Sequence, residues 1–402
     1  MDRRSFLTIA GIGAAYLLRP SLARACPTQG GSSSANWADR LGPGSAMGRL
    51  GELLAPDHNG IRLPAGFSSR IVAESGNRPV SSSSYAWHAA PDGGATFAHP
   101  EGGWVYVSNC EMPLGFGGAS ALRFDESGTL VDAYPILGRT SGNCAGGATP
   151  WGTWFSCEEV RRGRVYECDP LGLRQPVALP ALGRFQHEAA VVDPLTGTVY
   201  MSEDEPDGRL YRFRPTVPRH LERPDLSAGV LEVASLAPDG SGSVVWLRVP
   251  DPEAGRKPTR WQVPESTGFD GGEGMSYCDG VVYLATKGDN RVWALDLGED
   301  RLEVIYDQAT AATPILGGVD NVETNASGDV LVAEDGDDMQ IVVLPREGEP
   351  VALLQVTRQG GSEITGLAFT PDMSRLYFSS QRGFSGRVTG GITYEVTGPF
   401  VG

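Results

Sequence analysis

A cysteine and two adjacent carboxylates lie close together in residues 143–159, NCAGGATPWGTWFSCEE. Cys144 lies in a glycine-rich loop with too few apolar residues for a helix or a strand. Glu158 and Glu159 follow the single predicted strand TWFSC. Because this strand can double back on the loop, the thiol and the carboxylates could reach one metal ion. Residues 143–159 are therefore the first candidate for a metal site.

Similar polar clusters recur at the ends of other predicted strands. They are Asn109 with Glu111, Glu158 with Glu159, Glu203 with Asp204, Lys287 with Asp289, and Glu334 with Asp335. Many oxygen donors suit a hard cation such as calcium, whereas a thiolate favours a transition metal. Any single pair is more often a turn or a solvated strand edge, but five clusters at equivalent positions predict one shared site.

Other chemistry has weaker support in the sequence. The five histidines form no HxH or HExxH motif, and no GxSxG elbow or phosphate-binding P-loop occurs. His187 and Glu188 are the one His–Glu pair placed to enter a strand. Glu273 lies in a glycine-rich segment, as a ligand or as part of a surface loop, and Asp320 could equally form an Asx turn. A standard zinc hydrolase is not indicated.

Short strands that alternate with glycine-containing turns must position these residues. Six units recur, at 104–128, 153–170, 188–213, 280–297, 325–344 and 366–383, and a last strand follows at 391–396. This pattern predicts an all-β fold, a six-bladed β-propeller, with five or seven blades as alternatives. Residues 225–265 predict an extra hairpin between the third and fourth units. A blade cannot bury its faces alone, so residues 61–402 are expected to form one domain, preceded by a Ser/Gly/Pro-rich segment at 26–60.

The N-terminal residues 1–25 have the features of a twin-arginine signal peptide. Arg3 and Arg4 precede a short apolar run and an Ala-x-Ala cleavage box at 23–25. We therefore expect export by the twin-arginine machinery to the periplasm or the cell exterior. Cys26 directly after the box leaves a lipoprotein as the second interpretation.

Charge and cysteine content narrow the partners. The formal net charge is −16, which argues against nucleic acid and anionic membranes as partners. No apolar run is long enough for stable insertion into a membrane. Cys157 and Cys168 flank a short turn, and their spacing suggests a disulfide across a hairpin.

The chain resembles the PhoX family of bacterial alkaline phosphatases. The resemblance rests on NCAGGATPWGTWFSCEE, on GRFQHEAAVVDPLTGTVYMSEDEPDGRLYRF, and on GVDNVETNASGDVLVAEDG with EITGLAFTPD, and it covers most of residues 60–396. It implies a six-bladed propeller that hydrolyses phosphate monoesters by metal-ion catalysis, with two ferric ions and several calcium ions. It also implies that Cys144, Glu188 and Glu273 belong to the catalytic metal centre, with further metal contributions from Glu158, Glu159, Asn109, Asp320, Glu334 and Asp335.

Two positions depart from the family pattern. The family has a phosphate-holding arginine two residues before the glutamate that matches Glu273, and this chain has Gly271 there. The family's Gln-His-Pro-Gly run is replaced by Gln-Arg-Gly at 381–383. Lys287 and Arg382 are the candidates for supplying the positive charge that binds substrate.

Two other functions remain open from the sequence. The segment VDNVETNASGDVLVAEDG also resembles calcium-dependent lactonases or esterases built on a propeller, which would need no iron. A non-catalytic propeller that binds a ligand is the other alternative, and Gly271 is its main support.

Overall fold

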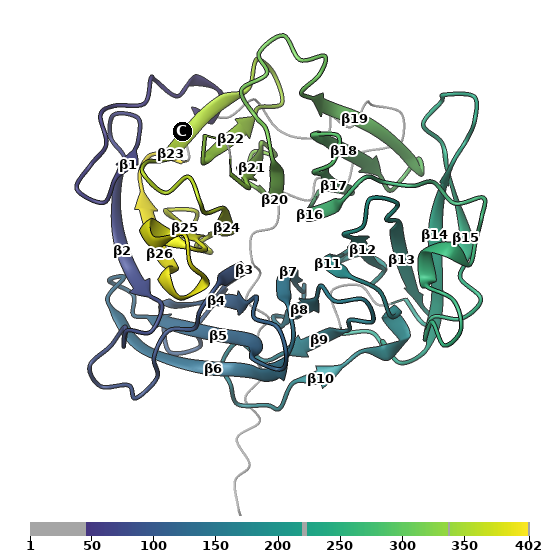
Figure 1. The fold of residues 1–402 in the computed structure, drawn as a ribbon, viewed down its shortest axis with the longest axis horizontal. Helices are drawn as coiled ribbons and strands as arrows, with labels where there is room; N and C mark the ends of the chain where they lie inside the picture. Colours follow the sequence, from purple (N-terminus) through teal and green to yellow (C-terminus); the bar gives the residue numbers. More distant parts are fainter. Residues whose placement is uncertain (1–45, 219–222, 337, 401–402) are drawn as a thin grey trace, which may run out of the picture.

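Six β-sheets surround a central axis in the computed structural model, which describes residues 46–218, 223–336 and 338–400 (Figure 1). The chain passes once around the ring, and each sheet radiates outward from the axis as one blade. The prediction of a six-bladed β-propeller is confirmed. The predicted signal peptide and residues 26–45 lie outside the described residues.

The blades are numbered here in chain order from their innermost strands. Blade 1 has β3 (Pro91–Ala98), β4 (Trp104–Cys110), β5 (Gly117–Phe124) and β6 (Leu130–Thr140). Blade 2 has β7 (Asn143–Ala148), β8 (Trp154–Glu158), β9 (Val165–Cys168) and β10 (Val177–Ala178). Blade 3 has β11 (His187–Val192), β12 (Val199–Glu203), β13 (Leu210–Pro215), β14 (Gly229–Leu236) and β15 (Val244–Arg248).

The last three blades complete the ring. Blade 4 has β16 (Gly272–Cys278), β17 (Val281–Thr286), β18 (Arg291–Asp296) and β19 (Arg301–Asp307). Blade 5 has β20 (Val319–Thr324), β21 (Val330–Glu334), β22 (Gln340–Leu344), β23 (Val351–Val356) and the N-terminal β1 (Ile61–Arg62). Blade 6 has β24 (Ile364–Phe369), β25 (Arg375–Ser380), β26 (Ile392–Thr397) and the N-terminal β2 (Ser68–Glu74).

Strands from the two ends of the chain close the ring. β2 pairs antiparallel with β26, so that Ser68 faces Thr397, and β1 adds to the edge of β23. This closure fixes the two ends of the propeller against each other, and it covers the outer edges of blades 5 and 6.

The apolar core is divided among the six interfaces between neighbouring blades. Each interface has one cluster of buried side chains, such as Phe155 with Tyr211 between blades 2 and 3, or Leu331 with Phe378 between blades 5 and 6. The other four interfaces are built in the same way. Since each blade buries its faces only against its neighbours, the six blades stabilise one another.

Two local expectations need correction or refinement. Cys157 and Cys168 are both free thiols, so the predicted hairpin disulfide is wrong. In the β8–β9 ladder, Cys157 pairs with Val165 and Cys168 with Trp154, which places the two thiols three rungs apart. The predicted extra hairpin at 225–265 forms β14 and β15, the outer strands of blade 3.

Helical structure is limited to short 3-10 turns in the described part. They are Ala46–Arg49, Pro180–Leu182, Thr259–Trp261, Gly383–Ser385 and Val388–Gly390. Within these residues, no helix has the length and apolar character needed to cross a membrane.

Candidate metal centre

The innermost strand of every blade carries a β-bulge near its start. The pairing register shifts between residues 91 and 94, 143 and 146, 187 and 190, 272 and 275, 319 and 322, and 365 and 368. A bulge leaves residues unpaired and re-aims their side chains. In blades 1 to 5 the first unpaired residue is always a metal-ligating type: Asp92, Cys144, Glu188, Glu273 and Asp320. Blade 6 has Gly366 at this position.

The residue after each of these donors is small in most blades, because neighbouring inner strands approach backbone to backbone. A Cβ added to Gly93 would lie 2.4 Å from the Cα of Ala145 on the next blade. A Cβ added to Gly274 would lie 2.7 Å from the Cα of Asn321. These contacts allow the ring to close tightly enough for donors from separate blades to meet.

A second set of polar residues comes from the ends of the second strands. Glu111, Glu159, Asp204, Lys287 and Asp335 each directly follow β4, β8, β12, β17 and β21. In blade 6, Gln381 and Arg382 follow β25. The second strand runs antiparallel to the first, so its end lies beside the bulge of the innermost strand, at the same end of the central axis. We call this end of the axis the mouth of the propeller.

Eight carboxyl groups and one thiol meet at this mouth in four overlapping groups. In each group, ligand atoms from three residues lie within 4.8 Å of one another. The groups are Cys144, Glu159 and Glu188; Asp92, Glu111 and Glu363; Glu188, Glu273 and Asp320; and Asp320, Asp335 and Glu363. Because Glu188, Asp320 and Glu363 each belong to two groups, the groups form one continuous acidic cluster, which we call the mouth cluster.

Burial makes the mouth cluster unfavourable without a cation. Glu188 is 1% exposed, and its Oε1 has no hydrogen-bond partner among the described residues. Burial, reinforced by the carboxylates of Glu273 and Glu159, raises the pKa of Glu188 well above its ordinary value. Burial also raises the pKa of Glu273, next to Asp320. Buried carboxylates this close require protons or bound cations.

The thiol of Cys144 lies in the same environment. Burial and the carboxylates of Asp92 and Glu188 raise its pKa well above the ordinary value. Burial, followed by the charges of Asp204 and Glu111, raises the pKa of Glu159 to about 9. Metal coordination would deprotonate both groups, because a bound cation favours the anionic form of its ligands.

A glutamine links two blades within the mouth cluster. Nε2 of Gln381 donates to Asp92 Oδ2 and to Glu111 Oε2, each at 2.7 Å. Oε1 of Gln381 is buried and has no hydrogen-bond partner in the described part of the chain. Together with Glu188 Oε1, this leaves two unpaired buried oxygens at the cluster, as expected of a site built for cations.

Two cationic side chains face these eight carboxyl groups. Nζ of Lys287 lies 3.2 Å from Glu273 Oε1, and 3.1 Å from both Asp320 Oδ2 and Asp335 Oδ2. Burial lowers the pKa of Lys287, but these carboxylates together raise it above its ordinary value. Nη2 of Arg382 lies 2.7 Å from Glu363 Oε1. If all eight carboxyl groups were ionised, six negative charges would remain unbalanced.

Asn109 lies behind the mouth cluster and positions Cys144. Its Nδ2 donates to the backbone oxygen of Cys144 at 2.8 Å and to that of Ala145. Its Oδ1 accepts hydrogen bonds from Trp154 Nε1 at 3.0 Å and Ser156 Oγ at 2.8 Å. Its side-chain amide is fully used in these contacts, so the structure does not place Asn109 among the metal donors that the sequence suggested.

Glu158 and Glu334 also point away from the mouth cluster. The carboxylate of Glu158 accepts hydrogen bonds from the backbone N–H groups of Ser141 at 3.0 Å and Arg164 at 3.2 Å. Glu334 accepts from the N–H groups of Gly317 at 3.0 Å and Gln340 at 2.8 Å. In Glu158–Glu159 and in Glu334–Asp335, the last residue of the strand binds the connecting loops, and the residue that follows it belongs to the mouth cluster. Two of the predicted metal donors are therefore placed elsewhere.

The sequence reasoning did not select three members of the mouth cluster as site residues: Asp92, Glu111 and Glu363. Asp92 stands in PDGG, which has the composition of a simple turn. The sequence feature that could have identified Asp92 is a metal-ligating residue followed by a small residue at the start of an inner strand, as in Cys144-Ala145 and Glu273-Gly274. Glu363 precedes β24 and is not at the bulge, so only its proximity to Asp320 and Asp335 reveals it.

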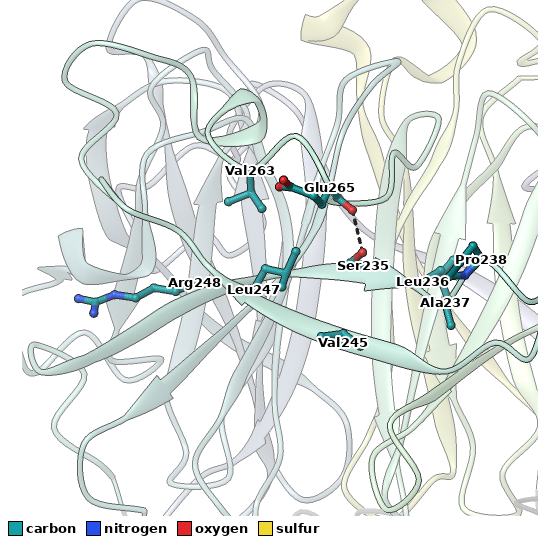
Figure 2. A pocket seen from close by; sticks show the side chains of 9 residues that line it. All are labelled: Ser235, Leu236, Ala237, Pro238, Val245, Leu247, Arg248, Val263 and Glu265. Carbon is teal, nitrogen blue, oxygen red and sulfur yellow. Dashed lines mark hydrogen bonds between the residues drawn. The ribbon is translucent and has the colours of Figure 1, made fainter.

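A separate cavity lies on the outer strands of blade 3, away from the bulged innermost strands. A groove of about 570 Å³ on blade 3 is lined mainly by apolar residues of β14 and β15 and by Val263 (Figure 2). Ser235 Oγ donates to the backbone oxygen of Glu265 at 2.7 Å across it, and the Arg248 side chain extends away from the other labelled residues. Since the groove brings no set of metal donors together, the mouth cluster is the better candidate for a reactive site.

Comparison with known proteins agrees with the resemblance seen in the sequence. Residues 118–283 match the family model for alkaline phosphatase PhoX. The structure is similar to Pseudomonas fluorescens PhoX in complex with vanadate, a transition state analogue, with a TM-score of 0.68 and 17% identity. This similarity covers 89% of this chain and 98% of that chain. The resemblance to the PhoX alkaline phosphatases is confirmed.

The PhoX family match extends from β5 to β17. It therefore includes Cys144, Glu159, Glu188 and Glu273, while Asp92, Asp320 and Glu363 lie outside it. A structural genomics protein of unknown function from Bacteroides thetaiotaomicron is less similar, with a TM-score of 0.47 and 8% identity over 82% of this chain and 76% of that chain. No curated protein matches this chain in sequence.

Proposed function

We propose that this protein is a metal-dependent phosphatase-like hydrolase of phosphate monoesters, acting at the mouth cluster. The observation that carries the proposal is the meeting of Cys144 and Glu159 with the buried Glu188, next to six further carboxyl groups, with Glu188 Oε1 unpaired among the described residues. A buried set of acids with two cations is costly unless bound metal ions compensate it. The relationship to PhoX supports the choice of phosphate esters over other substrates.

The donor chemistry fits two kinds of cation. A thiolate beside carboxylates suits a transition metal, and we propose that Cys144, Glu159 and Glu188 hold part of a centre of two ferric ions. The remaining groups offer only oxygen donors, which suits calcium. We propose that several calcium ions bind among Asp92, Glu111 and Glu363 and around Asp320.

The metal ions would supply Lewis acidity, which offsets the charge that develops on phosphate oxygens. The protein's own residues would set the geometry for this. Bulges on five inner strands aim donors at one point, and Asn109 fixes the backbone at Cys144 through two hydrogen bonds. Such preorganisation reduces the reorganisation needed during reaction.

Arg382 is the better of the two cationic candidates for substrate binding. Its guanidinium has five donors, and its one ion pair with a described residue is to Glu363. Its side chain is 33% exposed at the mouth, so a phosphate group can approach it. Lys287, by contrast, is already bound to three carboxylates. We therefore assign a phosphate-orienting role to Arg382, and expect it to compensate for Gly271.

The proposal is tested by metal content and by a panel of substrates. The mature protein, isolated without chelators, should contain iron and calcium and should hydrolyse an aryl phosphate monoester faster than a diester or a lactone. Glu159→Gln should lose most of this activity. Glu158→Gln is the matched control, because among the described residues the carboxylate of Glu158 accepts hydrogen bonds from backbone N–H groups alone. Calcium without iron, together with lactone hydrolysis, would refute the phosphatase assignment.

We also propose export through the twin-arginine pathway to the periplasm or the cell exterior, with a small phosphorylated molecule as the substrate. The arginines at positions 3 and 4 and the Ala-x-Ala box support this location. Replacing both arginines with lysine should retain the protein in the cytoplasmic fraction. Unchanged fractionation would contradict this route.

A further inference from the structure

The ammonium group of Lys287 is bound as a small metal ion would be. It contacts Glu273 from its own blade and Asp320 and Asp335 from blade 5, at 3.2, 3.1 and 3.1 Å. An ammonium has three N–H donors, so three carboxylates can use all of them. Glu273 and Asp320 also form a possible metal group with Glu188, and Asp320 and Asp335 form another with Glu363. Lys287 therefore lies between two potential cation positions.

The position of Lys287 in the repeat is unusual. In blades 1, 2, 3 and 5 the residue directly after the second strand is acidic: Glu111, Glu159, Asp204 and Asp335. Blade 4 has Lys287 at the same place. A cation therefore replaces a carboxylate at one of the points where the fold would otherwise add negative charge to the mouth cluster.

The choice of lysine also points to a specific role. The chain has 33 lysines and arginines, and Lys257 and Lys287 are its only lysines. An ammonium is a compact point charge, whereas the planar guanidinium of arginine suits bidentate pairing with one carboxylate. Three carboxylates from two blades around one point require a compact cation, which explains a lysine here in a chain that otherwise uses arginine.

We propose that Lys287 is a built-in cation that permanently occupies one position of the mouth cluster and reduces by one the number of metal ions that the cluster binds. This inference rests on the proposed metal centre. Lys287 supplies one positive charge to Glu273, Asp320 and Asp335, so these three carboxylates do not need a separate calcium ion. Metal ions fill the remaining donor groups, and the ammonium stays in place when they bind.

Metal stoichiometry tests the proposal directly. Chelated protein is dialysed against Ca²⁺ alone, and bound calcium is measured by elemental analysis and titration calorimetry. Lys287→Met should bind one more calcium ion per chain than wild type, because the three carboxylates lose their cation but keep their geometry. Lys257→Met, which changes the exposed lysine, is the control and should bind the wild-type number. An unchanged number in Lys287→Met would overturn the proposal.

A charge-balanced variant separates this role from a loss of folding. Lys287→Met combined with Asp335→Asn removes one positive and one negative charge from the same contact. It should return the calcium number to that of wild type. If the double variant also binds the additional ion, the charge of Lys287 does not set the stoichiometry, and the inference fails.

A second measurement needs no variant at all. Amine-specific acylation followed by peptide mass spectrometry can compare the two lysines of wild-type protein with and without Ca²⁺. Lys257 should be modified in both states, and Lys287 should stay at least tenfold slower in both, because its N–H groups remain bound to carboxylates. Acylation of Lys287 at the rate of Lys257 after calcium addition would show that the metal displaces the ammonium, and would overturn the proposal.

These outcomes are distinct from failure of the proposed function. Calcium number and lysine protection are measured without any substrate. Wild-type protein without phosphatase activity, together with an additional calcium in Lys287→Met, would refute the function and support the built-in cation. Phosphatase activity of the wild type, together with equal calcium numbers in wild type and Lys287→Met, would support the function and refute the built-in cation.

Discussion

Glu159 should make the chelated protein less stable as pH rises, and its raised pKa allows the size of this contribution to be worked out. Its pKa is raised from an ordinary value of 4.5 to about 9, first by burial and then by Asp204 and Glu111. Between these two values the folded state keeps a proton that the unfolded state has released. Stability therefore decreases with pH, by about 1.4 kcal/mol per pH unit for one such group.

The expected change is large enough to measure. From pH 5 to 7.5, Glu159 alone should cost about 3 kcal/mol of folding free energy. About 350 residues are described, and an unfolding entropy of roughly 2.1 cal/mol/K per residue converts this into a shift of about 4 °C in Tm. The other acids of the cluster with raised pKa values act in the same direction. His88 and His187 act in the opposite direction up to about pH 6.5, because burial lowers the pKa of each to about 3. The shift due to Glu159 is therefore measured as a difference between wild type and a variant at this residue.

The assay is thermal unfolding in EDTA between pH 5 and 7.5, for wild type, Glu159→Gln and the exposed-loop control Glu126→Gln. The Tm difference between wild type and Glu159→Gln should change by about 4 °C across this range, because the amide does not titrate. Saturating Ca²⁺ should abolish the loss in wild type, since metal competes with protons for the carboxylates. A Tm difference between chelated wild type and Glu159→Gln that does not change with pH would refute the reasoning.

Four further changes test individual contacts. Cys144→Ala should lower bound iron and hydrolysis together, and full iron content in the variant would exclude Cys144 as a ligand. Asn109→Ala removes four hydrogen bonds and should cost about 3 kcal/mol in chemical unfolding, whereas a loss below about 0.5 kcal/mol would contradict its positioning role. Arg382→Ala should raise the inhibition constant of inorganic phosphate about tenfold or more, with Arg382→Lys between the two, and an unchanged constant would remove Arg382 from phosphate binding. Gly93→Val should give unstable or insoluble protein, since even a Cβ would lie 2.4 Å from the Cα of Ala145, and a normal Tm would contradict the close approach of β3 and β7.

Much of the architecture can be predicted from the sequence, because it follows from short local patterns of residues. Short strands at regular intervals, each with glycine turns, predict the blades, and the recurring polar residues after the second strands indicate the mouth of the propeller. The donor types at Cys144, Glu188, Glu273 and Asp320 were also identified, through the resemblance to PhoX. The β14–β15 hairpin was recognised as additional, but its attachment to blade 3 depends on pairing with β13.

The structure differs from the sequence expectations where the outcome depends on the direction in which a side chain points from its strand. Successive residues of a strand point to opposite faces, so of Glu158 and Glu159 only one can face the axis. The sequence alone does not distinguish the two residues, and the strand register places Glu159 at the mouth cluster. The same register separates Cys157 from Cys168, so that two thiols flanking a turn do not meet.

By itself, the sequence determined the propeller class, the chemical types of the candidate donors and the excess of negative charge, because these follow from residue identity and local periodicity. It favoured six blades but left five or seven open. Only the tertiary structure decided which donors share a site. Asp92 and Glu363 are separated by most of the chain, and they become neighbours because β2 closes the ring beside β26. The six bulges then turn donors from separate blades toward one axis, and Lys287 acquires three carboxylate partners from two blades. Such convergence depends on ring closure and strand register, which no short segment of sequence specifies.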